Sequence, residues 1–146
     1  MTTVVKSFQE LEPGELYKIL QLRASIFVVE QNCAYQDLDD KDQFALHVMG
    51  KSNNELQAYT RVFGPGSYFK DASIGRVVVG KNSRGKGYGK VIMEQSIQLI
   101  HDRFGPVKIM LSAQSYLKKF YRELGFSETG EEYLEDGIPH IKMYKN

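Results

Sequence analysis

A glycine-rich segment, Arg84-Gly85-Lys86-Gly87-Tyr88-Gly89, carries the clearest chemical signal in the sequence. Glycine has no Cβ, so it adopts a positive φ easily and lets the backbone come close to a ligand. A β-branched run at residues 73–79 precedes the segment, and a run with helical periodicity follows it. Unpaired N–H groups and the dipole at the start of such a helix favour an anion, above all a phosphate. Arg84 and Lys86 add positive charge beside this predicted anion site.

The spacing of the glycines indicates which phosphate ligands the segment does not match. The chain contains no GxxxxGKS/T motif, which argues against a P-loop nucleotidase. Gly85, Gly87 and Gly89 form GxGxG rather than GxGxxG, so the dinucleotide fingerprint is not matched either. A plain tight turn with solvated basic side chains is the alternative interpretation of the segment.

Four blocks of sequence together resemble a known family. Arg84-x-x-Gly87-x-Gly89 after Val77-Val78-Val79 resembles the pyrophosphate loop of the GNAT acyl-CoA N-acyltransferases. The later run Phe120-Tyr121-Arg122-Glu123-Leu124-Gly125-Phe126 is similar to the FYxxLGF segment of the same family. The runs at residues 22–31 and 133–140 resemble the ElaA-like branch of GNAT proteins. The resemblance covers nearly the whole chain.

The resemblance implies a fold and an activity. The implied fold is α+β, with a GNAT-like mixed, mostly antiparallel central sheet flanked by helices, and residues 1–146 form one GNAT domain. The implied activity is transfer of the acetyl group of acetyl-CoA to a primary amine by direct attack, without a covalent acyl-enzyme. Two alternatives stay open: an acyl-homoserine lactone synthase-like acyltransferase, and a catalytically silent CoA-binding or sensor module.

The resemblance also implies which residues hold acetyl-CoA. The loop would bind the pyrophosphate mainly through backbone N–H groups, and the preceding strand would pair with the pantetheine arm. A backbone N–H near Val77 or Val78 is the implied donor to the oxyanion that forms at the thioester carbonyl. The implied cofactor-binding residues are Val77, Val78, Val79, Arg84, Gly85, Lys86, Gly87, Tyr88 and Gly89.

Acetyl transfer also needs groups that move protons. Tyr121 is the implied general acid, because a phenol with a pKa of about 10 is protonated at neutral pH and can donate to a thiolate. A half-buried packing tyrosine is the alternative interpretation. Glu30, His140 and Glu135 are candidates for the general base, and a chain of water molecules could replace all three.

Three features near the N-terminal helix admit structural or functional interpretations. Arg23 interrupts the apolar face of that helix, so it needs a partner, either Glu30 or an acid of the loop that follows. That loop, residues 31–43, is rich in aspartate and predicts either an acidic rim that attracts cationic amines or a solvated loop. Cys33 is interpreted as a small apolar filler rather than a nucleophile.

Periodicity predicts the elements that must position these residues. A helix follows Pro13, strands cover residues 44–49 and 56–62, and a buried strand covers 73–79. A helix after the glycine-rich segment ends at Gly105, and a strand at 107–113 follows it. Ser115 is the predicted N-cap of another helix, which Gly125 closes, and two strands complete the chain at 126–133 and 138–144.

Composition limits the classes of protein to which the chain can belong. The chain has 146 residues, 42% hydrophobic and 25% charged, which is typical of a globular protein. The net charge of +1 argues against a general nucleic-acid binder. One cysteine, no signal-peptide pattern and no apolar run of ~20 residues predict a soluble cytoplasmic protein without membrane contact. We expect no metal site and a small-molecule or peptide amine as partner, and a homodimer stays open.

Overall fold

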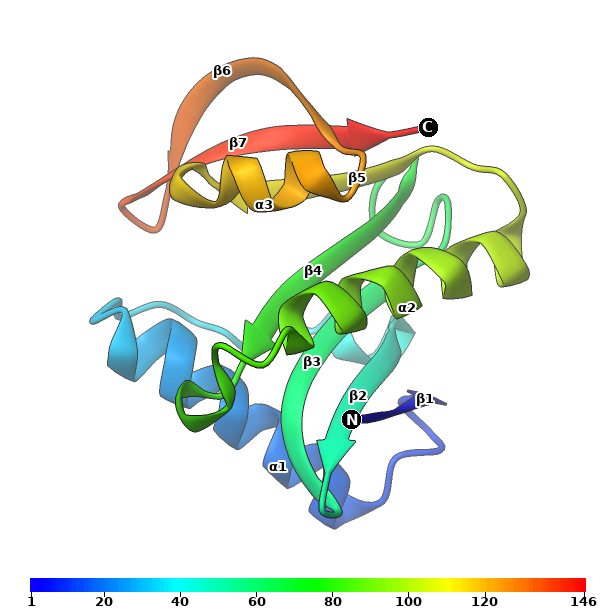
Figure 1. Cartoon of the computed structure of the whole chain (residues 1–146), viewed down its shortest axis with the longest axis vertical. Coiled ribbons are helices and arrows are strands. Elements are labelled where there is room, and N and C mark those ends of the chain that lie inside the picture. Colours follow the sequence, from blue (N-terminus) through cyan, green and yellow to red (C-terminus); the bar gives the residue numbers. More distant parts are fainter.

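A seven-stranded sheet forms the centre of the computed structural model, which describes residues 1–146 (Figure 1). Its strand order is β1-β2-β3-β4-β5-β7-β6, and every neighbouring pair is antiparallel except β4 and β5. The strands are β1 (Thr2–Ser7), β2 (Leu46–Ser52), β3 (Glu55–Phe63), β4 (Ala72–Val79), β5 (Ile109–Gln114), β6 (Ser127–Glu135) and β7 (Ile138–Lys145). This mixed, mostly antiparallel sheet flanked by helices is the fold class that the sequence predicted.

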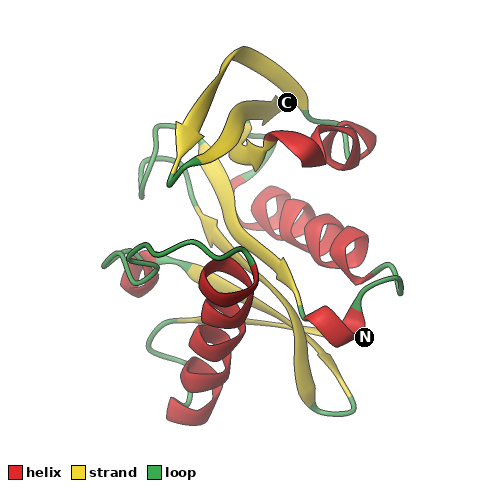
Figure 2. Cartoon of the chain, turned by 90° about the vertical axis from the view of Figure 1, so that its left-hand side faces the viewer, coloured by secondary structure: helices red, strands yellow, loops and turns green.

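The helices cover both faces of the sheet. They are α1 (Pro13–Arg23), which runs on into a π-helix at Ala24–Glu30, then α2 (Tyr88–Phe104) and the short α3 (Lys118–Glu123). Figure 2 shows α1 and α2 on opposite sides of the strands. Neighbouring strand residues point to opposite faces, so Val48 and Ala58 pack with α2, whereas Met49 and Tyr59 pack with α1. The chain therefore has two buried apolar clusters, one on each face.

The parallel pair in the middle of the sheet separates soon after it starts. Only Ala72 and Ser73 of β4 pair with β5, opposite Ile109 and Met110. Beyond this point β4 runs away from β5, as Figure 1 shows. The remainder of β4 therefore pairs with β3 on one side and leaves its other edge without a strand.

Several predicted boundaries are confirmed by the fold. Pro13 begins α1, and Gly105 follows the last residue of α2 with φ +83°. Gly125 closes α3 with φ +97°, and its N–H donates to Arg122 O at 3.0 Å. The N–H of Phe126 donates to the carbonyl oxygen of Tyr121 at 3.1 Å, which completes a Schellman motif.

Other predicted elements were wrong or missing. Ser115 does not cap a helix: it begins a 3₁₀ turn, Ser115–Leu117, and its buried hydroxyl has no hydrogen-bond partner. Leu117 is the N-cap residue of α3 instead. The strand predicted from residue 107 starts at Ile109. Strand β1 at the sheet edge was not predicted, because its residues, TTVVKS, neither alternate between apolar and polar nor form a continuous apolar run.

Candidate active site

A cavity of about 550 Å³ lies where β4 and β5 separate. The π-helix, β4, β5, α3 and the turn between β6 and β7 form its walls. Its lining includes most residues for which the sequence predicted a role: Glu30, Val77, Val78, Val79, Arg84, Gly89, Tyr121, Glu135 and His140. Residues that are 110 positions apart in the chain therefore meet in one cavity because the sheet opens at its centre.

The glycine-rich segment forms the turn that begins α2. Gly85 and Gly87 have φ values of +79° and +76°, and a Cβ on either residue would stand in open space. No acceptor in the chain takes the backbone N–H groups of residues 84–90, and the first helical bond runs from Val91 N to Gly87 O at 3.2 Å. The first turn of α2 also contains no acidic residue. These N–H groups therefore form a positive backbone surface with room for a phosphate.

The edge of β4 continues from this turn along the cavity. Val77 and Val79 pack toward α2, whereas Val78 is buried toward α1. The side chains are therefore part of the core, and the main chain along the same residues has no strand beside it on the cavity side. Packing of the side chains therefore leaves the backbone of the three valines free on the cavity side, and its pairing with a pantetheine arm stays a prediction.

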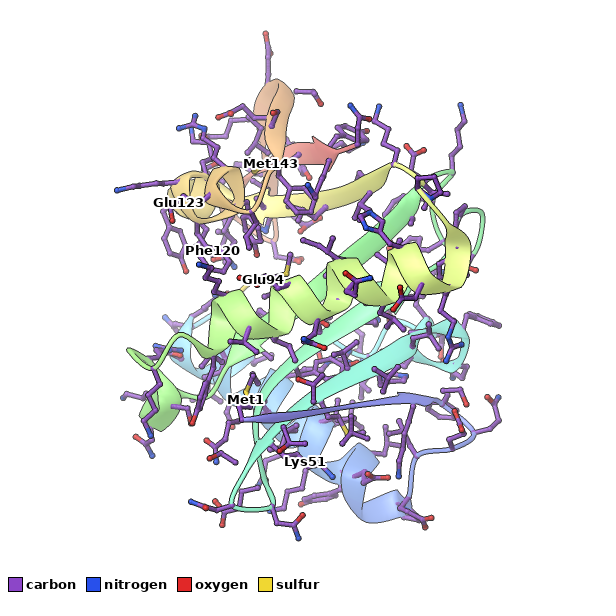
Figure 3. All side chains as sticks on the ribbon, turned by 45° about the vertical axis from the view of Figure 1, so that its right-hand side comes forward. Met1, Lys51, Glu94, Phe120, Glu123 and Met143 are labelled. Atoms are coloured by element: carbon purple, nitrogen blue, oxygen red, sulfur yellow. The ribbon has the colours of Figure 1, made fainter.

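Tyr121 lies on α3 at the wall of the cavity and is 5% exposed. Its ring packs edge-on against Phe120 and Phe126. Figure 3 shows Phe120 between α3 and α2, and a Cβ on Gly89 would come within 3.5 Å of its ring. Burial raises the pKa of the Tyr121 phenol above its usual range, so the hydroxyl keeps its proton at neutral pH.

The imidazole of His140 is held in one orientation. Its Nδ1 lies 2.7 Å from the carbonyl oxygen of Ile138, and a carbonyl only accepts, so Nδ1 carries a proton. Nε2 lies 3.2 Å from Glu135 Oε2, and a carboxylate also only accepts, so in this contact Nε2 carries a proton as well. Nε2 can therefore act as a base only after it has passed that proton to Glu135, and both residues line the cavity.

The carboxylate of Glu30, unlike the imidazole of His140, is held by an arginine. Its two carboxylate oxygens accept hydrogen bonds of 2.6 Å from the Arg84 guanidinium. These bonds lower the pKa of Glu30, which makes the carboxylate a weaker base. The pair also ties the end of the π-helix to the turn before α2.

The aspartates of the loop form a buried cluster with three arginines. Arg23 is fully buried and contacts Asp37 Oδ2 at 2.9 Å and Asp42 Oδ1 at 2.8 Å. Arg61 contacts Asp42 Oδ1 at 2.9 Å and Asp39 Oδ1 at 2.8 Å. The partner of Arg23 is thus an acid of the loop and not Glu30. The predicted acidic rim is wrong, because these carboxylates neutralise arginines.

Some residues of the cavity gave no signal in the sequence. The Gln31 and Gln114 amides hydrogen-bond each other at 3.2 and 3.3 Å, although 83 positions separate them. Cys33 is not a core filler: it lines the cavity, and its Sγ lies 3.3 Å from the carbonyl oxygen of Asp136. His47 is buried in β2 and contacts the Tyr59 hydroxyl at 2.6 Å, away from the cavity.

Comparison with known proteins identifies the family. The family model for the acetyltransferase (GNAT) domain matches residues 21–146. The chain belongs to the GNAT acetyltransferase family. It is 40% identical over 136 residues to protein ElaA of Escherichia coli, covering 92% of this chain and 89% of ElaA. A UPF0039 protein of Schizosaccharomyces pombe is 41% identical over 142 residues, covering 96% of this chain and 93% of that protein.

Solved structures of GNAT proteins have the same fold. The crystal structure of an acyl-CoA N-acyltransferase from Pseudomonas aeruginosa superposes with a TM-score of 0.94 at 37% identity, covering 100% of both chains. The GNAT fold uses acyl-CoA as a co-substrate, and the unpaired N–H groups of residues 84–90 fit its phosphates. No group of three or more His, Cys, Asp and Glu side chains is arranged to hold a metal, and none of the helices is long and apolar enough to cross a bilayer.

Proposed function

We propose that this GNAT protein transfers the acetyl group of acetyl-CoA to a primary amine by direct attack. One observation carries the proposal: the turn with unpaired N–H groups begins and ends at two residues, Arg84 and Gly89, that line the same cavity as the free edge of β4. Gly85, Lys86, Gly87 and Tyr88 lie between these two residues, outside the cavity lining. This backbone surface suits a ligand with phosphates at one end and an extended amide-containing arm at the other. Acetyl-CoA has that form.

The loop and β4 bind and orient the co-substrate. The N–H groups of residues 84–90 take the diphosphate, with Lys86 adding charge beside them. The free edge of Val77, Val78 and Val79 pairs with the pantetheine arm. A backbone N–H at Val77 or Val78 donates to the thioester carbonyl, where negative charge develops during attack.

Two cavity side chains move the protons. Tyr121 donates its phenolic proton to the departing thiolate, and its buried surroundings keep it protonated until then. Of the three candidates for the base, His140 has the most suitable geometry, because Ile138 O holds its Nδ1 proton and its Nε2 can pass a proton to Glu135 before it takes one from the amine. Glu30 is the weaker candidate, since Arg84 holds both of its carboxylate oxygens.

The acceptor that we propose is a small molecule or peptide carrying a primary amine. Glu135 and Asp136 line the cavity, and unlike Glu30 neither carboxylate is held by an arginine. They suit an incoming ammonium group. A cytoplasmic location is part of the same proposal.

Ligand-dependent thermal unfolding tests the proposal. Acetyl-CoA at 100 times its Kd should stabilise the fold by about 2.7 kcal/mol and raise Tm. Gly87→Val should abolish this rise, because a side chain would fill the space in front of the N–H groups. Gly66→Val is the matched control: Gly66 has φ +80° and open space as well, but lies in the β3–β4 connection.

The outcomes separate binding from catalysis. A rise of Tm that survives Gly87→Val as well as Gly66→Val would move the phosphate site elsewhere. No rise in the wild-type protein would remove the proposed co-substrate. Release of free thiol from acetyl-CoA with a panel of primary amines then tests turnover, and binding without release would indicate a CoA-binding module.

A further inference from the structure

Arg76 interrupts the regular course of β4 at the cavity. Its φ of +49° lies in the left-handed region, which residues other than glycine rarely adopt. The pairing of β3 with β4 shifts at the same place: Arg61 pairs with Gly75, but Tyr59 pairs with Val78. Two residues of β4, Arg76 and Val77, therefore face one residue of β3, which is a β-bulge.

The bulge changes which face the following residues occupy. Ile74 packs toward α2, so a regular strand would place residues 76 and 78 on that face as well. Instead Val77 and Val79 pack toward α2 and Val78 packs toward α1. The same one-residue change exchanges the backbone groups that point to β3 with those that point to the cavity. Gly80 N donates to Gln57 O at 2.8 Å, so Val78, two residues earlier in the same register, also points its N–H to β3. The bulge thus leaves the N–H of Val77, and not that of Val78, on the cavity side.

The side chain of Arg76 is fixed on the other side of the bulge. Its Nε lies 2.8 Å from Asp37 Oδ1, and its Nη2 donates to the carbonyl oxygen of Asp37 at 3.0 Å. Nη2 also lies 3.5 Å from Asp39 Oδ2, and the guanidinium stands 5.7 Å from the centre of the Tyr35 ring. A strained backbone persists only where its surroundings hold it in place, and these contacts supply such a hold.

Two further arginines hold the aspartates that contact Arg76. Arg23 holds Asp37, and Arg61 holds Asp39 with two hydrogen bonds of 2.8 Å. Neither aspartate lines the cavity, whereas Arg76 does. Asp37 therefore reaches the cavity only through side chains that line it: Arg76, and Tyr35, whose hydroxyl donates to Asp37 Oδ1 at 2.9 Å.

We propose that Arg76 is a positioning residue: anchored by Asp37 and Asp39, it fixes the bulge of β4 and so aims the N–H of Val77 at the thioester carbonyl. This inference rests on the proposed function, since it needs acetyl-CoA to lie along β4. The aspartate-rich loop thereby gains a role in the reaction without touching either substrate.

Carbon NMR of acetyl-CoA labelled with ¹³C at the carbonyl tests this without an identified acceptor. A hydrogen bond to the carbonyl moves its resonance downfield when the ligand binds. Arg76→Ala should lose most of this shift, because alanine resists a positive φ, while the Kd for acetyl-CoA stays within about twofold. Arg76→Gly should keep more of the shift than Arg76→Ala, since glycine tolerates the bulge. Asp37→Asn should reduce the shift as well.

Asp40→Asn is the matched control. It removes a charge from the same loop, but Asp40 is exposed and forms no ion pair, so the carbonyl shift should match the wild type. A wild-type shift in Arg76→Ala or in Asp37→Asn would overturn the inference. Equal loss in the alanine and glycine variants together with a wild-type shift in Asp37→Asn would assign the effect to direct contact of the guanidinium with the ligand and also overturn it. No binding by the wild-type chain would instead refute the proposed function.

Discussion

The buried ion cluster gives a quantitative prediction for stability. Asp42 Oδ1 accepts hydrogen bonds from Arg23 at 2.8 Å and Arg61 at 2.9 Å, and both guanidinium groups are almost completely buried. In Asp42→Asn the amide oxygen can still accept both bonds, so the variant loses mainly the charge. Three buried or half-buried arginines then face two carboxylates. Removing one partner of a buried pair costs about 3–5 kcal/mol, and we expect the lower end, about 3 kcal/mol.

Urea unfolding measures this loss. A chain of this length has a stability of about 10 kcal/mol, so the variant should still fold. With an m-value of about 2 kcal/mol per M, the midpoint should fall by about 1.5 M. Asp40→Asn is the control, because Asp40 is an exposed residue of the same loop that forms no ion pair, and asparagine tolerates its φ of +61°. Its stability should change by less than about 0.5 kcal/mol. Equal midpoints for the two variants would refute the reasoning.

Three further perturbations follow from the site and the cluster. The pKa of Asp39 is lowered from 3.8 to about 2 by Arg61, against the effect of burial, so its ion pairs stabilise the fold by about 2 kcal/mol above pH 4. This contribution should disappear as the pH falls from about 4 to 2, and Asp39→Asn should remove the dependence in urea unfolding; an unchanged pH slope would contradict the ion pairs. Tyr121→Phe should lower kcat for thiol release about a hundredfold with little change in acetyl-CoA affinity or Tm, and wild-type turnover would exclude the acid role. Glu30→Gln should leave kcat within about threefold and change mainly the KM for acetyl-CoA, because it frees Arg84 beside the phosphates; a kcat loss above about tenfold would identify Glu30 as the base.

The sequence predicted those parts of the structure that depend on local backbone chemistry. Gly85 and Gly87 do adopt positive φ, Gly125 does close α3, and Pro13 does begin α1. Each of these outcomes follows from one residue type and its immediate neighbours, without knowledge of the tertiary fold. The fold class and the family followed from the resemblance, since spacing alone left the type of phosphate ligand open.

Features that depend on contacts between distant residues could not be predicted. The run Val77-Val78-Val79 has no polar alternation, so nothing in it indicates that a bulge at Arg76 changes the face of each valine. The aspartates at residues 37–42 would show the same sequence pattern in a solvated loop as in a buried ion cluster. Their pairing depends on Arg61 and Arg76, which belong to strands that follow later in the chain.

The binding chemistry of one half of the cavity can be predicted from the sequence better than that of the other half. The half toward α2 presents backbone N–H groups, so the proposed binding of acetyl-CoA there requires the absence of side chains, which glycines in the sequence indicate. The half toward the β6–β7 turn is built from side chains such as Gln31, Gln114 and Glu135, which lie far apart in the chain. Their chemistry arises only when the sheet brings them together. We therefore expect this second half to select the amine, and exchanging the β6–β7 turn between relatives should change the acceptor without changing acetyl-CoA affinity.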